Sequence, residues 1–371
     1  MRIVTVVGAR PQFIKAAPVS RVLRQAAHAE VLIHTGQHHD EAMSAAFFRD
    51  LEMDEPQVNL EVAGGSHGQM TGEMLRRLEP ALLEHEPDGV LVYGDTNSTL
   101  AGALAAAKVA WPDGRRPWLV HVEAGLRSFN RSMPEERNRI VADHLADLLL
   151  APTPVAMAHL AREGLGSRAE LVGDVMVDAH RWALERADAH LPDVVRGLGR
   201  YLLVTLHRAE NVDDPTRLRR LLDALAVGLP VLFPIHPRTR SAIGRFGLTL
   251  PEAVIPMPPL GYLAMVAAQA HATAIATDSG GLQKEAYLAG VPCITLRAET
   301  EWTETVDAGW NRLVGADPAA LAAALDDEAF LRRDRPRPEL YGDGRAAERI
   351  VAALERAAAS GGSDRQEGDE A

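Results

Sequence analysis

The segment MRIVTVVGARPQFIK, residues 1–15, joins an apolar run to a polar turn, and this combination indicates the class of fold. Residues 3–8 form an almost continuous apolar run, which is typical of a strand buried on both faces of a parallel sheet. Gly8 permits a tight turn, and Pro11 suits the first turn of a helix. The segment therefore predicts a strand that leads directly into a helix, which is how a doubly wound α/β domain begins.

Similar apolar runs recur along the chain and alternate with helical patterns such as the alanine-rich residues 99–110. In the first half these runs lie at residues 3–8, 29–36, 89–95, 117–125, 148–153 and 169–174. In the second half they lie at residues 201–207, 230–236, 272–278, 291–296 and 311–315. Because strands alternate with helices in both halves, the sequence predicts two Rossmann-like α/β domains that face each other across a cleft.

The length of 371 residues exceeds what one hydrophobic core organises and suits two domains. A helix followed by a loop separates the two series of strands near residues 175–200, so we expect domains at residues 1–175 and 195–345. The last helical pattern, residues 346–359, is predicted to cross back onto the first domain. The polar residues 360–371 are predicted to form a disordered tail.

Composition excludes several classes of function. The net charge of -12 argues against a nucleic-acid partner, which would favour a basic face. The chain has no run of ~18 apolar residues, so we expect no membrane insertion. The single cysteine, Cys293, lies in an apolar run and is predicted to be a buried thiol, which favours a reducing cytoplasm.

The sequence lacks the usual motifs of metal binding, of serine hydrolases and of hydride transfer. The nearest approach to a metal motif is His38-His39-Asp40, which we interpret as a polar loop, so the sequence predicts no metal. No serine lies in a GxSxG turn, and no GxGxxG follows a strand.

Polar residues follow several strands of the first half. They lie at the carboxyl ends of the strands, and ligands of such sheets bind beyond these ends. Arg10 and Lys15 would add positive charge to a helix N-terminus suited to an anion. Asp95 either caps the next helix through the TNST segment or exposes a carboxylate at the cleft floor. Glu123 is a poor helix cap and precedes Ala-Gly, so we expect its carboxylate to be open to a ligand above the sheet.

Glu135 has two interpretations that the sequence leaves open. Ser132 and Glu135 have the spacing of a capping box, and Glu135 and Arg139 are an i,i+4 pair. Glu135 is therefore either purely structural or also directed into the cleft.

The second half places histidines and glycines at its strand ends. His207 and His236 each follow a strand, and a histidine there can bind a phosphate or relay a proton. A helix start with two glycines lets backbone amides approach a phosphate closely. That start is formed by Ser279, Gly280 and Gly281. Glu285 lies one turn further, where it could accept hydrogen bonds from a ribose.

Eight motifs, in order along nearly the whole chain, resemble the non-hydrolysing UDP-N-acetylglucosamine 2-epimerases. The motifs are GARPQFIKAAP (8–18), TGQH (35–38), GDTNST (94–99), HVEAGLRS (121–128), MPEERNR (133–139), HRAEN (207–211), TDSGG (277–281) and LQKEA (282–286). The resemblance implies the glycosyltransferase-B architecture, with a nucleotide sugar in the cleft and a homodimer as the usual assembly. It implies no metal and no redox cofactor.

The resemblance also implies roles for particular residues. Arg10 and Lys15 would lie near the diphosphate and the sugar. The three acids of proton handling would be Asp95, Glu123 and Glu135. The remaining matches are His207 near the phosphates, Ser279, Gly280 and Gly281 at the diphosphate, Glu285 at the ribose, and Leu260 and Met265 at the uracil.

The implied reaction inverts C2 of a UDP-2-acetamido sugar. Loss of the C2 proton is coupled to departure of UDP from C1, and UDP then adds back to the bound glycal. Alternatives are a hydrolysing 2-epimerase, a glycosyltransferase of the same fold and a non-catalytic nucleotide-sugar sensor.

Two departures from the family pattern bear on the sugar. Where the family commonly has Thr-Glu-Arg-Pro-Glu, this chain has TEWTE at residues 300–304, so Trp302 replaces an arginine. Residues 64–72 lack the arginine with which some members bind a second, activating UDP-sugar. These features resemble the branch acting on UDP-2,3-diacetamido-2,3-dideoxyglucuronate, whose anionic sugar would suit Arg127 and Arg131.

Overall fold

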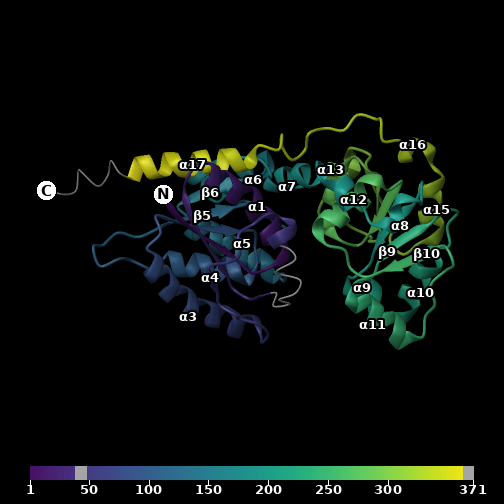
Figure 1. The fold of residues 1–371 in the computed structure, drawn as a ribbon, viewed down its shortest axis with the longest axis horizontal. Coiled ribbons are helices and arrows are strands. Elements are labelled where there is room, and N and C mark those ends of the chain that lie inside the picture. Colours follow the sequence, from purple (N-terminus) through teal and green to yellow (C-terminus); the bar gives the residue numbers. More distant parts are fainter. Residues whose placement is uncertain (38–47, 362–371) are drawn as a thin grey trace. The chain divides into compact units, whose positions relative to one another are not determined.

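The computed structural model describes residues 1–37 and 48–361 and consists of two compact units (Figure 1). Unit 1 comprises residues 1–179 and the described part of residues 341–371, and unit 2 comprises residues 180–340. The His38-His39-Asp40 segment and the predicted tail from residue 362 onward lie outside the described residues.

Unit 1 is built on a seven-stranded sheet with the order β3-β2-β1-β4-β5-β6-β7. All neighbouring strands of this sheet run parallel. The strands are β1 (Arg2–Val7), β2 (Ala29–His34), β3 (Val58–Asn59), β4 (Gly89–Tyr93), β5 (Trp118–Val122), β6 (Leu148–Ala151) and β7 (Ala169–Leu171). The strand order reverses between β1 and β4, and ligands of doubly wound folds bind beyond the carboxyl ends of the strands at such a point.

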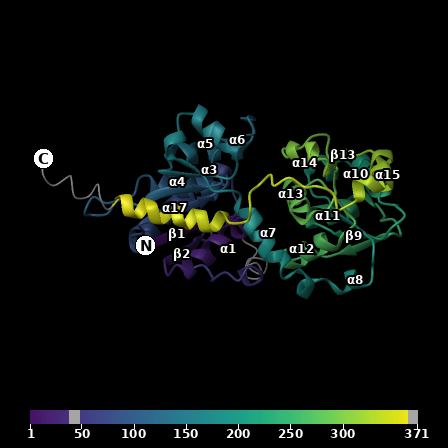
Figure 2. The ribbon, with the colours of Figure 1, turned by 90° about the horizontal axis from the view of Figure 1, so that it is seen from above.

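The helices of unit 1 are α1 (Arg10–Gln25), α3 (His67–His85), α4 (Asn97–Ala106), α5 (Pro134–Leu145), α6 (Pro154–Arg162), α17 (Ala346–Gly361) and the start of α7 (Val175–Leu184), with a short 3-10 turn η1 (Gly166–Arg168). The C-terminal helix α17 belongs to unit 1 and lies along α1 (Figure 2). Asp178 of α7 accepts hydrogen bonds from the backbone amides of Ala346 (3.1 Å) and Ala347 (2.8 Å), so it caps the free N–H groups at the start of α17.

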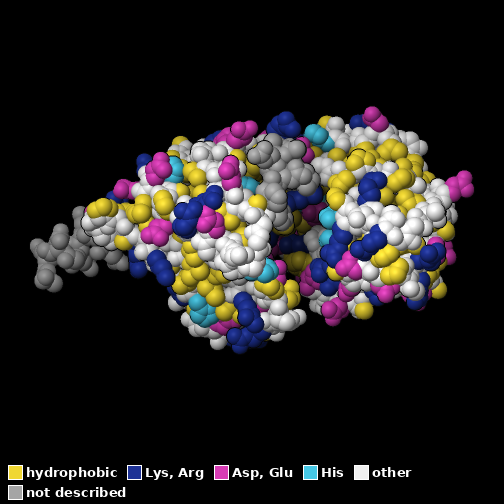
Figure 3. All heavy atoms as spheres, turned by 90° about the horizontal axis from the view of Figure 1, so that it is seen from below, with side chains coloured by type: hydrophobic (Ala, Val, Ile, Leu, Met, Phe, Trp, Pro, Cys, Tyr) yellow, Lys and Arg dark blue, Asp and Glu magenta, His cyan; other side chains and the backbone are white. Residues whose placement is uncertain are grey.

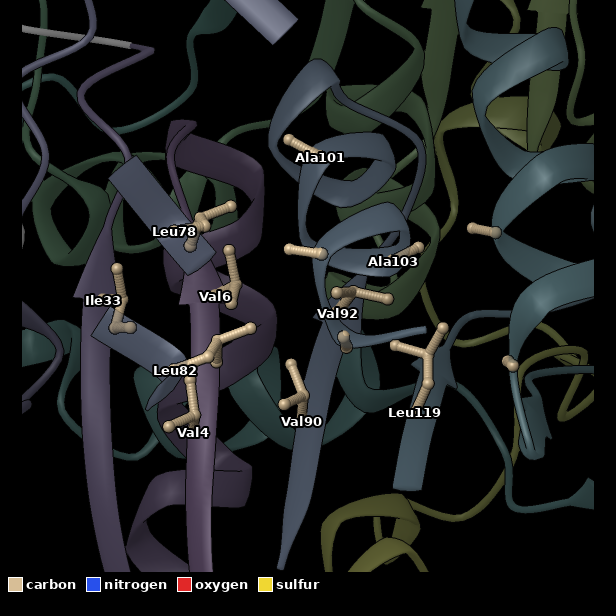
Figure 4. Close-up of a cluster of buried hydrophobic side chains, with 14 of the residues drawn as sticks. Val4, Val6, Ile33, Leu78, Leu82, Val90, Val92, Ala101, Ala103 and Leu119 are labelled. Atoms are coloured by element: carbon tan, nitrogen blue, oxygen red, sulfur yellow. The ribbon is translucent and has the colours of Figure 1, made fainter. Parts of the chain in front are cut away.

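One hydrophobic cluster of unit 1 lies between the sheet and helices that include α3 and α4 (Figure 4). Val4 of β1 is paired in register with Val31 of β2 and with Val90 of β4. The other buried members of this core that the figure labels are Val6, Ile33, Val92, Leu119, Leu78, Leu82, Ala101 and Ala103. Gly102 of α4 lies against the sheet, since a Cβ there would lie only 2.8 Å from the side chain of Val92 in β4.

Unit 2 repeats the same design with a six-stranded sheet of order β10-β9-β8-β11-β12-β13. Its parallel strands are β8 (Leu202–Thr205), β9 (Val231–Pro234), β10 (Val254–Met257), β11 (Ala274–Thr277), β12 (Cys293–Thr295) and β13 (Asn311–Leu313). Its helices are η2 (Ala187–His190), α8 (Asp193–Arg196), α9 (Ala209–Val212), α10 (Pro215–Asp223), α11 (Pro237–Phe246), α12 (Tyr262–His271), α13 (Gly280–Ala289), α14 (Thr303–Asp307), α15 (Pro318–Asp326) and α16 (Glu328–Leu331). The strand order reverses between β8 and β11.

The predicted α/β class with two Rossmann-like sheets is confirmed. Sequence reasoning missed two strands, β3 and β10, and both are edge strands. β3 has two residues and β10 contains Pro256, so neither has the long apolar run that identifies a central strand. Cys293 of β12 is a buried free thiol, as predicted, and burial raises its pKa to about 12.

The surface carries charges of both signs. On the face seen in Figure 3, Lys and Arg side chains are intermixed with Asp and Glu side chains. None of the helices in the described residues is both long and apolar enough to cross a membrane.

Candidate active site

The carboxyl ends of β1, β4 and β5 bring three of the predicted residues together in unit 1. Lys15 lies in the second turn of α1, the helix that follows β1, and Glu123 directly follows β5. The Lys15 ammonium forms an ion pair with the Glu123 carboxylate, and both side chains are nearly buried, at 14% and 12% exposure. Asp95 follows β4, the strand between them. The topology therefore gathers a cation and two carboxylates at the switch point of the sheet.

The backbone at Glu123 is strained. Its φ of 73° lies in the left-handed region, which a glutamate adopts only at a free-energy cost. The backbone amides of Glu123 and Ala124 both donate to the carbonyl of Leu150 in β6, at 3.0 and 3.1 Å. Non-glycine residues held in this way cluster at functional sites, and here the conformation turns the carboxylate toward Lys15.

Gly94 lies directly under this ion pair. A Cβ atom at Gly94 would lie 3.2 Å from Oε2 of Glu123 and 3.3 Å from Nζ of Lys15, and the φ of Gly94 is 63°. A side chain here would be strained and would crowd the pair, so a glycine is required before Asp95.

Asp95 does not cap the next helix, which settles one of its two interpretations. Thr96 is the N-cap of α4 and accepts a hydrogen bond from the amide of Thr99. The Asp95 carboxylate instead forms an ion pair with Arg139 of α5 and keeps 31% of its side chain exposed. Asn138 of α5 donates to the Asp95 carbonyl at 2.9 Å, so α5 holds both the backbone and the side chain of Asp95.

The capping box expected at Glu135 is wrong. Met133 is the N-cap of α5 and makes no side-chain capping bond, and Glu135 is exposed in the first turn. Arg139 pairs with Asp95 and with Glu136 (3.1 Å) rather than with Glu135. The role of Glu135 in proton handling stays a prediction.

Glu136 is the buried carboxylate of this segment, and sequence reasoning missed it. It is 1% exposed and accepts hydrogen bonds from Ser128 N and Oγ (both 2.9 Å) and from Phe129 N (2.8 Å). Burial alone would raise the pKa of its carboxyl, but these donors and Arg139 outweigh burial and lower the pKa. Glu136 therefore folds the loop between β5 and α5 onto the start of α5.

The expectation that Arg127 faces an anionic sugar is also wrong. Its guanidinium is 1% exposed, with Nη1 2.7 Å from Asp143 and Nη2 2.7 Å from Glu163. A buried arginine that already neutralises two carboxylates is not placed to bind a substrate carboxylate as well. Arg131 is exposed, so only this second arginine of the prediction lies at the surface.

The turn after β1 differs from the expectation as well. Gly8 has no positive φ, but a Cβ there would collide with the hydroxyls of Thr35 and Ser98, which are 2.8 Å apart. Gln12 of α1 accepts hydrogen bonds from the amides of Gly8 (2.9 Å) and Ala9 (3.1 Å). These two amides are thus satisfied by the protein, and Arg10, half-buried at the start of α1, is the cation nearest to this turn in the sequence.

In unit 2, the residues after β8 and β11 meet at the switch point of the second sheet. Asp278 follows β11, is fully buried and lies 3.1 Å from Nδ1 of His207, which follows β8. It also accepts hydrogen bonds from the amides of His207 and Arg208 and from Nδ2 of Asn211. Burial opposes ionisation, but these donors outweigh it and lower the pKa of Asp278.

This contact fixes the orientation of the His207 ring. Because Nδ1 faces the carboxylate, Nε2 is the nitrogen left to face a ligand, and the side chain is 37% exposed. The ring of His236 lies 5.5 Å away, and His236 caps α11 by accepting from the amide of Arg238 at 3.2 Å. The two predicted histidines are therefore neighbours. Sequence reasoning missed Asp278, although its place before the Ser-Gly-Gly segment was a usable signal.

The predicted phosphate cradle is the start of α13. Ser279 is its N-cap, and Gly280 and Gly281 are its first residues. A Cβ at Gly280 would collide with the carboxylate of Glu301, so this glycine leaves room for an acid at the helix start. The Glu301 carboxylate pairs with Arg297 (2.8 Å) and lies 3.7 Å from Arg208. An anion thus already lies where helix amides and two arginines favour one.

The remaining predicted residues also lie in unit 2. Glu285 of α13 is half-buried and accepts a hydrogen bond from Nε2 of Gln269 at 2.8 Å. Leu260 and Met265 pack half-buried against one hydrophobic cluster of this unit, which leaves part of each side chain accessible. Trp302 lies near Gly280 as well, and the Lys284 ammonium lies 5.0 Å from the centre of its ring.

Within residues 1–37 and 48–361, no group of three or more His, Cys, Asp or Glu side chains is arranged to hold a metal ion. The polar groups at the strand ends are carboxylates, cations, the rings of His207 and His236, and helix-start amides.

Two Rossmann-type sheets in one chain, with carboxylates after one and a glycine-rich helix start after the other, are the architecture of the glycosyltransferase-B fold class. The sequence profile described as UDP-N-acetylglucosamine 2-epimerase matches residues 21–355. The chain belongs to this family of isomerases.

Individual relatives agree with this membership. The chain is 46% identical over 361 residues to the UDP-2,3-diacetamido-2,3-dideoxy-D-glucuronate 2-epimerase of Pseudomonas aeruginosa, covering 95% of this chain and 98% of the relative. The structure of the Methanocaldococcus jannaschii UDP-GlcNAc 2-epimerase in complex with UDP-GlcNAc and UDP is similar with a TM-score of 0.82 and 40% identity, covering 96% of this chain and all of that one. The Neisseria meningitidis UDP-GlcNAc 2-epimerase bound to UDP-GlcNAc has a TM-score of 0.81 and 27% identity, with the same coverage.

Proposed function

We propose that this chain inverts C2 of a UDP-2-acetamido sugar by eliminating UDP to a glycal and adding it back. The observation that carries the proposal is the strained Glu123, whose carboxylate meets Lys15 on the strand end next to Asp95. Carboxylates paired with cations at a switch point suit the removal and return of a proton. Membership in the 2-epimerase family supports the same reaction.

In the proposed reaction a carboxylate takes the proton from C2 while the bond between C1 and the UDP oxygen breaks. The electron pair of the C2–H bond forms the C1=C2 double bond, and the pair of the broken bond leaves with UDP. When UDP adds back, a proton arrives on the opposite face of C2, so a second acid must lie across the ring. Asp95, Glu123 and Glu135 are the proposed acids, and Arg139 and Lys15 are the cations paired with the first two.

Unit 2 would bind the UDP moiety. Amides at the start of α13, the Ser279 hydroxyl and the His207 ring are proposed to hold the diphosphate, and His236 would support it from the next strand. Glu285 is proposed to bind the ribose, with Leu260 and Met265 at the uracil.

We propose UDP-2,3-diacetamido-2,3-dideoxyglucuronate as the first substrate to test and UDP-N-acetylglucosamine as the second. Support for the uronate comes from Trp302 at the position of the usual arginine and from the 46% identity to the Pseudomonas aeruginosa enzyme of that name. The burial of Arg127 removes one cation that was expected to favour the uronate, so the preference rests on these two observations.

We also propose that the enzyme is a homodimer of the reducing cytoplasm that supplies a sugar for surface polysaccharide synthesis. The buried free thiol of Cys293 is compatible with a reducing compartment. Light scattering of the purified chain would test the dimer directly.

Solvent exchange tests the reaction itself. The chain would be incubated with each UDP-sugar in D2O without an acceptor, and the products would be followed by NMR and mass spectrometry. Deuterium at C2 of an intact UDP-sugar, together with the C2 epimer, is the expected result. Accumulation of free UDP would identify a hydrolysing relative instead. A complete lack of exchange with both sugars would leave a transferase or a nucleotide-sugar sensor and would overturn the proposal.

A further inference from the structure

A buried histidine lies beneath the proposed acids of unit 1 and has no role in the function proposed above. His121 is the fourth residue of β5 and is fully buried. Its Nδ1 lies 2.7 Å from Oδ1 of Asp143, and its Nε2 lies 2.7 Å from the carbonyl oxygen of Gly94. Both ring nitrogens therefore lie within hydrogen-bonding distance of an oxygen atom.

The partner of His121 is equally buried. Asp143 of α5 has no exposed surface, and its second oxygen accepts from the amide of Gly125 at 3.1 Å and from Nη1 of Arg127 at 2.7 Å. Burial opposes its ionisation, but His121 and Arg127 outweigh burial and lower the pKa of Asp143. Glu163 accepts hydrogen bonds from Nε and Nη2 of Arg127, at 2.8 and 2.7 Å, so this guanidinium is shared by two carboxylates.

The two ends of this hydrogen-bonded chain reach both acid-bearing turns. Gly94 immediately precedes Asp95, and its carbonyl is held by the His121 ring. Gly125 lies two residues after Glu123, and its amide is held by Asp143. A shift of either atom would move a proposed acid, because Gly94 and Gly125 belong to the same turns as Asp95 and Glu123.

The strained backbone of Glu123 requires hydrogen bonds that hold it in place. A left-handed glutamate persists only where its surroundings hold the backbone in place. Asp143 holds the turn on one side of Glu123, and the Leu150 carbonyl of β6 holds it on the other. Hydrophobic contacts are not directional, so packing alone would not fix the orientation of these peptide groups as the hydrogen bonds do.

We propose that His121 and Asp143 are positioning residues that lock the turns carrying Asp95 and Glu123 into one catalytic geometry. The inference rests on the proposed epimerase function, since the relevant geometry is that of its acids. Neither residue touches the substrate in this proposal. Both act through the backbone, so their loss lowers the rate of C2 proton transfer more than it lowers nucleotide affinity.

The test compares variants that remove the hydrogen bonds with one that only weakens the core. His121→Phe keeps a ring but loses both bonds, and Asp143→Leu loses the carboxylate. Asp143→Asn is the conservative variant, because its amide can donate to a ring nitrogen and its oxygen can still accept from Gly125. Leu149→Ala is the control, since Leu149 is also fully buried and is paired in register with His121, but its side chain makes no polar contact.

Each variant would be measured for C2 deuterium exchange, for KM, for UDP affinity by calorimetry and for thermal unfolding. We expect His121→Phe and Asp143→Leu to lower kcat for exchange by at least tenfold at temperatures where they are folded. UDP affinity should stay within about twofold, and Asp143→Asn should recover much of the rate. Leu149→Ala should unfold at a lower temperature with kcat unchanged.

Two outcomes distinguish a failure of the positioning role from a failure of the proposed function. If the wild-type chain exchanges the C2 proton but the folded His121→Phe variant has the same kcat, the positioning role is wrong and the proposed function stands. If the wild-type chain shows no exchange with either UDP-sugar, the proposed function itself is wrong and the positioning role falls with it.

Discussion

Lys15 and Glu123 form a nearly buried ion pair although 108 residues separate them in the chain. The pair exists because β1 and β5 flank β4 in the sheet, so the turns beyond their carboxyl ends lie side by side. The backbone of Glu123, whose carboxylate forms this pair, lies in the left-handed region. The parallel sheet thus converts two distant polar turns into one site.

The first prediction concerns this ion pair. Glu123→Gln should lower C2 deuterium exchange by at least about a hundredfold, because the amide cannot take a proton. Lys15→Met should also lower exchange, and the double variant should be little worse than Glu123→Gln, because the two residues act as one unit. Arg24→Met, on the same helix α1 but in an exposed pair with Asp54, is the matched control and should keep full activity. Additive losses from the two substitutions would contradict a functional pair.

The second prediction separates two neighbouring carboxylates. Glu136→Ala should lower the free energy of unfolding by about 1–3 kcal/mol, because it removes the buried carboxylate that accepts hydrogen bonds from the amides of Ser128 and Phe129. Glu135→Gln should change it by less than about 0.5 kcal/mol, because Glu135 is exposed. Urea unfolding measures both values.

Exchange kinetics complete this comparison. If Glu135 is one of the three acids, its glutamine variant should be stable but slow in C2 exchange. A fully active Glu135→Gln variant would remove Glu135 from the mechanism and leave Asp95 and Glu123 as the acids.

The third prediction concerns the acid at the phosphate cradle. Glu301→Gln should bind UDP about two- to fivefold more tightly at low salt, which is the effect of removing one charge of the wrong sign near a helix N-terminus. The substitution also frees Arg297 and Arg208 to meet the diphosphate. Calorimetry at two salt concentrations would measure the gain, which should shrink at high salt.

Glu299→Gln is the control for this measurement, since Glu299 is an exposed carboxylate in the same loop. Weaker UDP binding by Glu301→Gln would show that Glu301 contributes to the nucleotide site instead of competing with it.

The fourth prediction concerns pH. His180 of α7 is 1% exposed, and no hydrogen-bond partner of either ring nitrogen is present among the described residues. Burial lowers its pKa to about 3, with a further contribution from Arg337. The unfolded chain therefore binds more protons than the folded chain between pH 3 and 6.5, and stability falls as the pH falls through this window.

His180→Leu should remove this part of the acid sensitivity. Relative to the variant, the wild-type chain should lose about 1.4 kcal/mol of unfolding free energy per pH unit between pH 6 and 4. The difference between the two chains should be constant above pH 7. A difference that does not depend on pH across this range would show that His180 is not buried in its neutral form.

Local sequence patterns specify most of the strands and helices and the positions at which polar side chains follow the strands. The apolar run of residues 3–8 specifies a buried parallel strand wherever it lies, because nearly every position in it is apolar. The Ser-Gly-Gly start of α13 and the histidines at 207 and 236 follow their strands as the pattern predicts. These features are local, so a single sequence carries them.

Which charges are paired and which are exposed depends on how the elements pack against one another. Glu135 and Glu136 are adjacent and chemically alike, yet the way α5 packs buries the second and leaves the first in solvent. The sequence predicted Arg127 as an arginine that faces the substrate, whereas in the structure its side chain is buried against Asp143. The energy of a charge depends on neighbours brought from other elements, and that information is absent from local sequence.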